Sequence, residues 1–121
     1  MNSYRDLKAW QLGMEVAEEI YTLTENFPKR YQFSLANQIE RSATSIPSNI
    51  AEGYCRKSKK DRSHFYFIAR GSLAELETQL TLATRKQFID REVMRILWDK
   101  LQELGKIING LIRYNNNESD S

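Results

Sequence analysis

The sequence is poor in the residues that cross-link a chain or interrupt its helices. Among 121 residues there are one cysteine, two prolines and five glycines. No apolar run reaches the roughly 18 residues that a membrane span needs. The single thiol, Cys55, can form neither a disulfide within the chain nor a cysteine metal cluster. The start of the chain is polar, where a signal peptide would be apolar. These absences predict a reduced, cytoplasmic protein with no membrane partner.

An excess of charge of one sign is also missing. The 18 basic and 16 acidic side chains leave a net charge of +2, so the overall composition carries no nucleic-acid signature. His64 is the only histidine, whereas a di-iron site in a helical bundle needs two Glu-x-x-His motifs. Cys55 beside Arg56 and Lys57 could be an activated thiol, but we interpret it as inert. With no glycine-rich phosphate loop either, we predict no catalytic residue, metal, cofactor or small-molecule substrate, and no enzymatic activity.

Four stretches carry apolar residues at the three- and four-residue spacing of amphipathic helices. The predicted core faces are Leu7, Trp10, Met14, Ala17, Tyr21 and Thr24; Leu35, Ile39, Ala43, Ile46 and Ile50; Phe65, Ile68, Ser72, Leu76, Leu80 and Ala83; and Val93, Leu97, Leu101, Leu104, Ile108 and Leu111. The connections between them are short, which favours antiparallel neighbours. We therefore predict an all-α protein, an antiparallel up-down-up-down four-helix bundle over residues 1–114, with 115–121 as a mobile polar tail. The second and third helices look longest.

Helix starts and interruptions refine this prediction. The expected N-caps are Asp6, Ser34, Ser58 and Asp90. Pro47 lies inside the second helix, where a proline costs roughly 3 kcal/mol. Because apolar residues keep their helical spacing on both sides of it, we expect a bent but continuous helix. Gly71, beside two other small residues, indicates a close approach of a neighbouring helix.

A polar stripe runs beside the apolar stripe of the second helix. It consists of Gln38, Arg41, Ser45, Asn49 and Glu52. Such a row usually faces solvent, but these short, mixed side chains suggest a contact with another helix or subunit. In the antiparallel third helix, Glu75 or Glu77 would lie near Arg41, which if buried would need an acidic partner.

Apolar residues also fall off the predicted core faces. They are Phe67, Leu73, Leu82, Phe88, Ile96, Ile107 and Ile112. A monomeric bundle needs one apolar stripe per helix, so a second one predicts contact with other copies of the chain.

Basic residues cluster in the connections. The densest run contains Arg56, Lys57, Lys59, Lys60 and Arg62, and a second group contains Lys29, Arg30, Arg85 and Lys86. An antiparallel bundle puts the first group at the end that holds both termini and the second group at the opposite end. Such runs are most often solvated loops, but a ring of copies would pool them into a phosphate-binding surface. Tyr31, Tyr54 and Tyr66 could stack bases near these ends, although packing is the more usual role.

Three motifs resemble those of a known family. They are Tyr4 to Trp10, Arg41 to Gly53 with its Ser-Ile-Pro-Ser-Asn-Ile-Ala-Glu-Gly core, and Gly71 to Thr78. Together they resemble the bacterial four-helix-bundle family of 23S rRNA intervening-sequence proteins. The resemblance implies homopentamers whose biochemical role is not settled. The family's fold is distantly similar to that of the accessory variability protein of diversity-generating retroelements, a basic pentamer that binds nucleic acid and a reverse transcriptase.

Two hypotheses for function follow. One is a non-enzymatic homo-oligomer, a pentamer by resemblance, that binds RNA or DNA through pooled basic ends. The other is a protein–protein adaptor or scaffold, with no nucleic-acid role, whose basic loops contact an acidic partner.

Overall fold

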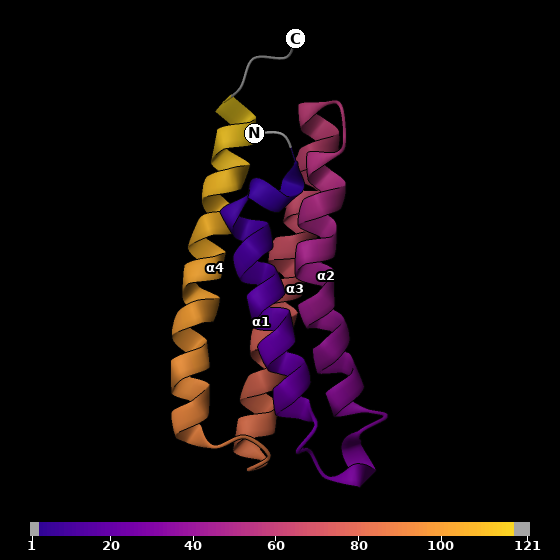
Figure 1. Ribbon diagram of the computed structural model, residues 1–121, viewed down its shortest axis with the longest axis vertical. Coiled ribbons are helices and arrows are strands. Elements are labelled where there is room, and N and C mark those ends of the chain that lie inside the picture. Colours follow the sequence, from indigo (N-terminus) through magenta and orange to yellow (C-terminus); the bar gives the residue numbers. More distant parts are fainter. Residues whose placement is uncertain (1–2, 118–121) are drawn as a thin grey trace.

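Four helices make up the bundle in the computed structural model, which describes residues 3–117. They are α1 (Lys8–Thr24), α2 (Leu35–Tyr54), α3 (Lys59–Arg85) and α4 (Arg91–Asn117), with 3-10 turns at η1 (Tyr4–Asp6) and η2 (Lys29–Tyr31). Each helix packs antiparallel to the next, and α4 returns to α1 (Figure 1). Within the described residues there is no strand, and none of their helices is long and apolar enough to cross a membrane. The predicted all-α, up-down-up-down bundle is confirmed.

Helix lengths differ from the prediction at one point. Both α3 and α4 have 27 residues, whereas α2 has 20 and α1 has 17. At 1.5 Å per residue, α3 and α4 are about 40 Å long and α1 about 25 Å. The fourth helix was underestimated because its last residues were assigned to a polar tail over 115–121. Asn115 to Asn117 are helical, so that assignment is wrong for them, and 118–121 lie outside the described residues.

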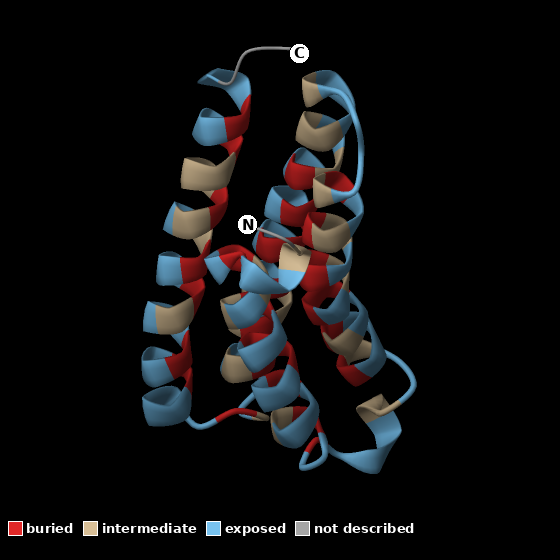
Figure 2. Cartoon of the chain, turned by 45° about the horizontal axis from the view of Figure 1, so that its top comes forward, coloured by how far each residue is buried: buried red, intermediate tan, exposed pale blue. Residues whose placement is uncertain are grey.

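Buried residues line the inward faces of the helices (Figure 2). They follow the predicted core face in α2 but not throughout the other helices. Met14, Tyr21, Ile68 and Val93 were expected inside and are exposed. The buried face instead includes Ala9, Gly13, Val16 and Ile20 in α1, Tyr66, Ala69 and Leu73 in α3, and Met94 and Ile112 in α4. Several of these buried residues, such as Ala9, Gly13 and Ala69, are small, whereas larger apolar residues on the same helices remain exposed.

Two of the four predicted caps bond as expected. The Ser58 hydroxyl accepts a hydrogen bond from the amide of Asp61 at 3.1 Å, and Asp90 Oδ1 accepts one from the amide of Glu92 at 2.8 Å. Ser34 occupies the N-cap position of α2 without a side-chain capping bond. Asp6 is not a cap, because it belongs to η1 and α1 begins after Leu7.

The helix α2 continues through Pro47, as predicted. The neighbouring side chains bond to carbonyls one turn earlier: Ser48 Oγ donates to the Thr44 carbonyl and Asn49 Nδ2 to the Ser45 carbonyl, both at 2.8 Å. Such bonds to carbonyls at i−4 are compatible with a local bend in a helix. The predicted continuity is therefore confirmed, and side-chain hydrogen bonds follow Pro47 on both of the next two residues.

The connection from α3 to α4 brings an aromatic residue back onto the core. Gln87 adopts a left-handed conformation with φ of 67°, and the Phe88 amide donates to the Ala83 carbonyl at 2.9 Å. The ring of Phe88 then packs on those of Phe27 and Tyr31, with centroids 5.7 and 4.8 Å apart. Tyr31 is thus a packing residue.

Candidate nucleic-acid interface

The bundle gathers its connections at two ends. The upper end in Figure 1 holds η1, the loop between α2 and α3, and the last turn of α4, while the lower end holds η2 and the loop between α3 and α4. This is the arrangement from which the two basic groups were predicted. Their positions at opposite ends follow directly from the antiparallel topology.

At the upper end, Lys57 and Lys60 are exposed cations. Neither side chain forms an ion pair or hydrogen bond in the part of the chain that the structure describes. Arg56 is more constrained, because its guanidinium lies 3.4 Å from Glu52 and 4.7 Å from the centroid of the Phe65 ring. The two lysines are therefore the cations of this loop most available to a phosphate.

Arg62 and Lys59, which were also predicted to contact nucleic acid, anchor the loop. Arg62 is half-buried and donates to the carbonyls of Arg56 and Lys57 at 3.0 and 3.2 Å. Its Nε also donates to Asn115 Oδ1 at 3.0 Å. Lys59 Nζ donates to the Asn116 carbonyl at 3.4 Å. Both side chains tie the start of α3 to the end of α4.

Asn115 completes this anchor. Its side chain is only 3% exposed, and its Nδ2 donates to the Lys59 carbonyl at 3.0 Å and to Ser63 Oγ at 2.9 Å. Together with the bond from Arg62, these contacts satisfy a buried amide. This network explains why a residue that looked like part of a polar tail is helical.

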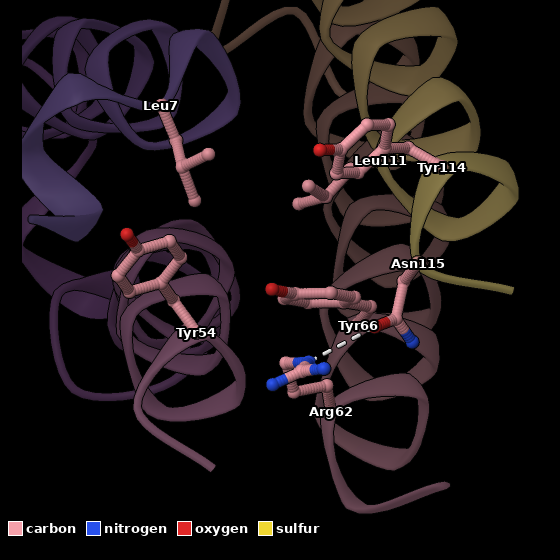
Figure 3. Close-up of a pocket in the computed structure, with 7 residues that line it drawn as sticks. All are labelled: Leu7, Tyr54, Arg62, Tyr66, Leu111, Tyr114 and Asn115. Carbon is pink, nitrogen blue, oxygen red and sulfur yellow. Dashed lines mark hydrogen bonds between the residues drawn. The ribbon is translucent and has the colours of Figure 1, made fainter. Parts of the chain in front are cut away.

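A pocket of about 750 Å³ opens beside this network. It is lined by Leu7, Tyr54, Arg62, Tyr66, Leu111, Tyr114 and Asn115, which Figure 3 shows around a common space. The pocket lies where α1 begins below the upper end, which α2, α3 and α4 reach (Figure 1). The residue before α1, Leu7, lies at its boundary.

The lower end carries the second basic group. Lys29, Arg85 and Lys86 are exposed and form no ion pair among residues 3–117. The guanidinium of Arg30 lies 5.5 Å from the centroid of the Tyr31 ring, a cation–π contact that leaves the charge at the surface. Arg95 differs from these cations because its guanidinium donates hydrogen bonds to Glu92, the shorter at 2.7 Å. These bonds raise the pKa of Arg95.

An acidic patch on α1 lies between the ends and is partly neutralised there. Lys100 of α4 donates to Glu15 at 3.0 Å and Glu19 at 2.5 Å, both on α1. The bond to Glu19, followed by that to Glu15, raises the pKa of Lys100. Charge is therefore sorted along the bundle: cations without partners lie at both ends, while this acidic patch holds its own lysine.

The predicted polar stripe of α2 contacts α3 through its centre. Ser45 Oγ lies 2.8 Å from Ser72 Oγ, and Asn49 Nδ2 donates to Ser45 Oγ at 2.9 Å. Ser42, which was not assigned to the stripe, donates to Gln79 Oε1 at 2.9 Å. The expectation of a helix–helix contact is thus confirmed for the middle of the stripe.

Arg41, a charged residue of the polar stripe, and its predicted acidic partners on α3 do not form the expected contact. Arg41 is exposed and pairs with neither Glu75 nor Glu77 within the described residues, so the predicted intramolecular pair is wrong. Glu77 instead accepts a hydrogen bond from Gln102 of α4 at 2.8 Å. Because the Arg41 side chain remains in water, it needs no partner within the bundle. A role at a subunit contact stays a prediction for Arg41 and Glu75.

Gly71 does not support close packing within the chain. It is exposed, and a β-carbon added to it would have no atom within 4 Å. The close approach occurs at Gly53, where an added β-carbon would lie 2.7 Å from Cε1 of Tyr66. No helix of the same chain therefore packs closely on Gly71, and the close approach of α2 and α3 is at Gly53.

The apolar residues off the predicted stripes divide into two sets. Leu73 and Ile112 are buried, so their assignment to a second face is wrong, and Phe88 and Ile107 pack against the core. Phe67, Leu82 and Ile96 are exposed, Ile96 by 55%. An apolar surplus thus remains on α3 and α4, although it is smaller than the sequence indicated.

This surplus borders grooves on both sides of α4. Val93 and Ile96 line a groove against Leu23 of α1, and Trp98 lines another against Leu82 of α3. Their volumes are about 450 and 550 Å³. A third groove of about 750 Å³ lies between α1 and α2 and is lined in part by Trp10, Met14, Tyr21 and Pro47.

The residues considered for chemistry remain isolated. His64 is exposed and lies edge-on to Phe65 with a centroid distance of 5.2 Å. Cys55 is an exposed free thiol. In the described part of the chain, no three His, Cys, Asp or Glu side chains converge as metal ligands would.

Sequence reasoning missed the upper pocket and the network around Arg62. A usable signal was present, because three aromatic residues, Tyr54, Tyr66 and Tyr114, fall near predicted helix ends that the topology brings together. Recognising the pocket also requires knowing that α1 does not extend to the upper end of the bundle. The sequence before Leu7 does not show this.

The fold and its ends define a class: small antiparallel helical bundles with cationic ends and apolar grooves. The chain belongs to the 23S rRNA-intervening sequence protein family, whose family model matches residues 5–110. A crystal structure from Bacteroides thetaiotaomicron VPI-5482, of a protein with unknown function from the S23 ribosomal protein family, is similar with a TM-score of 0.80 and 28% identity. The match covers 87% of this chain and 95% of that one. No curated protein matches significantly. The family resemblance derived from the motifs is confirmed, and the family's function is unknown.

Proposed function

We propose that the protein is a non-enzymatic homo-oligomer, a pentamer as the resemblance implies, that binds RNA or DNA through its basic ends. The observation that carries this proposal is the placement of unpaired cations. Lys57 and Lys60 at the upper end and Lys29, Arg85 and Lys86 at the lower end are exposed and form no ion pair among residues 3–117. Cations of this kind displace the counterions that are condensed on the phosphates of a nucleic acid. The release of these counterions drives binding independently of base sequence.

The apolar grooves support self-association. The groove between α1 and α2 and the groove between α3 and α4 lie on opposite faces, because the helices pack in the cyclic order α1, α2, α3, α4. Two different surfaces per protomer suit a head-to-tail contact, which closes into a ring when the rotation permits. A ring would repeat each basic end once per copy and raise the local positive potential.

The family's description supports nucleic acid as the partner, since it refers to an intervening sequence of 23S rRNA. Because the net charge of one chain is only +2, the proposal requires that several copies bring their basic ends together. One copy presents few free lysines at an end, whereas several copies in register would contact many phosphates. The expected binding is therefore steeply dependent on salt.

The test measures binding of labelled RNA and DNA duplexes by fluorescence anisotropy at several salt concentrations. We expect retention at about 50 mM salt, with affinity falling linearly on logarithmic axes as salt rises. Lys60→Glu should weaken binding, whereas Lys106→Glu should have a smaller effect, although it changes the charge equally. Lys106 is exposed on α4, away from both ends.

Absence of binding at about 50 mM salt would overturn the proposal. Equal losses from Lys60→Glu and Lys106→Glu would show that overall charge, not the basic end, drives binding. Co-purification with an acidic protein that is insensitive to nuclease, together with no nucleic-acid binding, would favour the adaptor hypothesis.

A further inference from the structure

The upper pocket has aromatic walls that come from three different helices. Tyr54 reaches in from α2, Tyr66 from α3 and Tyr114 from α4, and Figure 3 shows their rings around one space. The volume of about 750 Å³ lies within the 300–1,000 Å³ that is usual for ligand pockets. The pocket can therefore admit a planar group of moderate size.

The walls differ in how firmly they are held. Tyr66 is 2% exposed, and its ring lies where a β-carbon on Gly53 would be 2.7 Å away, so it is fixed by packing. Tyr114 is 65% exposed and stands at the edge. Tyr66 is thus the floor of the pocket, and the more accessible rings of Tyr54 and Tyr114 are those that a flat ligand would contact.

The polar groups of the pocket are largely occupied. Arg62 Nε bonds to Asn115 Oδ1, and the Asn115 amide donates to Lys59 and Ser63. The pocket therefore offers aromatic faces more than unused amide donors. Aromatic faces bind bases by stacking and accept every base, because each has a π-face.

Positive charge stands next to these rings. Lys57 lies beside the pocket, because its carbonyl accepts a hydrogen bond from Arg62, which lines it, and its exposed ammonium group has no partner in the described part of the chain. A ligand that combines a planar aromatic group with a phosphate fits both features. Resting on the proposed function, we infer that the pocket takes an unstacked base of a single-stranded nucleic acid while Lys57 contacts a flanking phosphate.

The test compares a short single-stranded RNA containing 2-aminopurine with its duplex, using the full chain at one fixed salt concentration. The single strand should bind more tightly than the duplex, and 2-aminopurine emission should fall as its base stacks in the pocket. Tyr114→Ala should weaken single-strand binding by about 5- to 100-fold and leave duplex binding unchanged. Tyr114→Phe, which keeps the ring, should bind like the parent chain.

Phe33→Ala is the matched control. It removes an aromatic side chain that is 95% exposed at the lower end, remote from the pocket, and should not alter either affinity. Thermal melting of Tyr114→Ala confirms that the fold persists, and Tyr54→Ala provides a second pocket variant.

Equal binding of strand and duplex, with no effect of either tyrosine variant, would overturn this inference while the proposed function stands. Failure of both nucleic acids to bind would overturn the proposed function itself. Free adenosine monophosphate binding as tightly as the strand would also overturn the inference, because the pocket would then be a mononucleotide site.

Discussion

Gly13 of α1 lies against the ring of Pro47 in α2: a β-carbon on the glycine would sit 3.5 Å from both Cβ and Cδ of the proline. Pro47 is buried, so its ring packs in the interface between these two helices. The proline removes one helical hydrogen bond, and the buried ring contributes apolar packing in return. This contact explains how a helix interior tolerates the residue.

Replacing Gly13 tests that contact. In Gly13→Ala the new methyl group would make ordinary van der Waals contact, and alanine is a better helix former by up to about 1 kcal/mol. We therefore expect an unchanged or higher free energy of unfolding in urea. Gly13→Leu should lower it by about 1–3 kcal/mol through overpacking. Equal destabilisation by the two substitutions would contradict the 3.5 Å spacing between a β-carbon on Gly13 and the ring of Pro47.

Gly53 should respond in the opposite way. A β-carbon there would lie 2.7 and 2.9 Å from two carbons of Tyr66 and 3.1 Å from the Arg62 carbonyl. Because the Tyr66 ring is buried and the carbonyl belongs to the backbone, neither can move freely. Gly53→Ala should lower the free energy of unfolding by about 1–3 kcal/mol, measured by urea titration.

Gly71→Ala is the control for Gly53, since both are glycines in helices. With open space around Gly71, alanine should stabilise the protein by up to about 1 kcal/mol. A loss of stability accompanied by a fall in mass would indicate instead that another copy packs closely on Gly71. A loss of stability at constant mass would contradict the open surroundings of this residue.

The anchor between α3 and α4 depends on Asn115. Asn115→Ala removes the acceptor for Arg62 and the donors to Lys59 and Ser63. Unsatisfied buried partners cost about 1–3 kcal/mol, and hydrogen exchange should accelerate in the first turn of α3. Asn117→Ala, an exposed substitution two residues away, should change neither quantity. Similar effects of both variants would mean that the network does not hold this end.

The contact of Lys100 with Glu19 and Glu15 predicts a dependence on pH. These bonds raise the pKa of Lys100 in the folded state, so the folded state holds this proton more tightly than the unfolded state does. The resulting stabilisation is complete below the ordinary lysine pKa of about 10.4 and is lost as pH rises through the raised value. Thermal melting at pH 8 and pH 11 should show a smaller alkaline decrease for Lys100→Gln than for the parent chain. A parallel decrease in both would exclude the linkage.

The architecture could be predicted from the sequence because helical spacing and short connections restrict the topology strongly. The face of α2 was predictable for the same reason, since Ile39, Ala43, Ile46 and Ile50 leave one apolar stripe. In α1 and α3, large apolar residues lie on two faces, and periodicity alone cannot decide between them. Burial of Val16 and exposure of Tyr21 depend on where the neighbouring helices lie.

For the candidate interface, the sequence predicted where the basic groups lie along the bundle. It did not predict which of the basic side chains are unpaired and which hold the loop in place. Antiparallel topology placed the basic groups at opposite ends. It could not separate Lys57 and Lys60, which stay unpaired among the described residues, from Arg62, which bonds to Asn115 across 53 positions of sequence. That difference, like the pocket beside it, depends on the relative lengths of the helices.

The mass of the protein in solution tests the central claim, that copies assemble through the exposed apolar grooves and so pool their basic ends. Light scattering should give a mass several times the 14.2 kDa of one chain, and five times for a pentamer. Ile96→Glu, which places a charge on an exposed groove residue, should reduce that mass without unfolding the helices. A parent chain that stays at 14.2 kDa at every concentration measured would contradict the account.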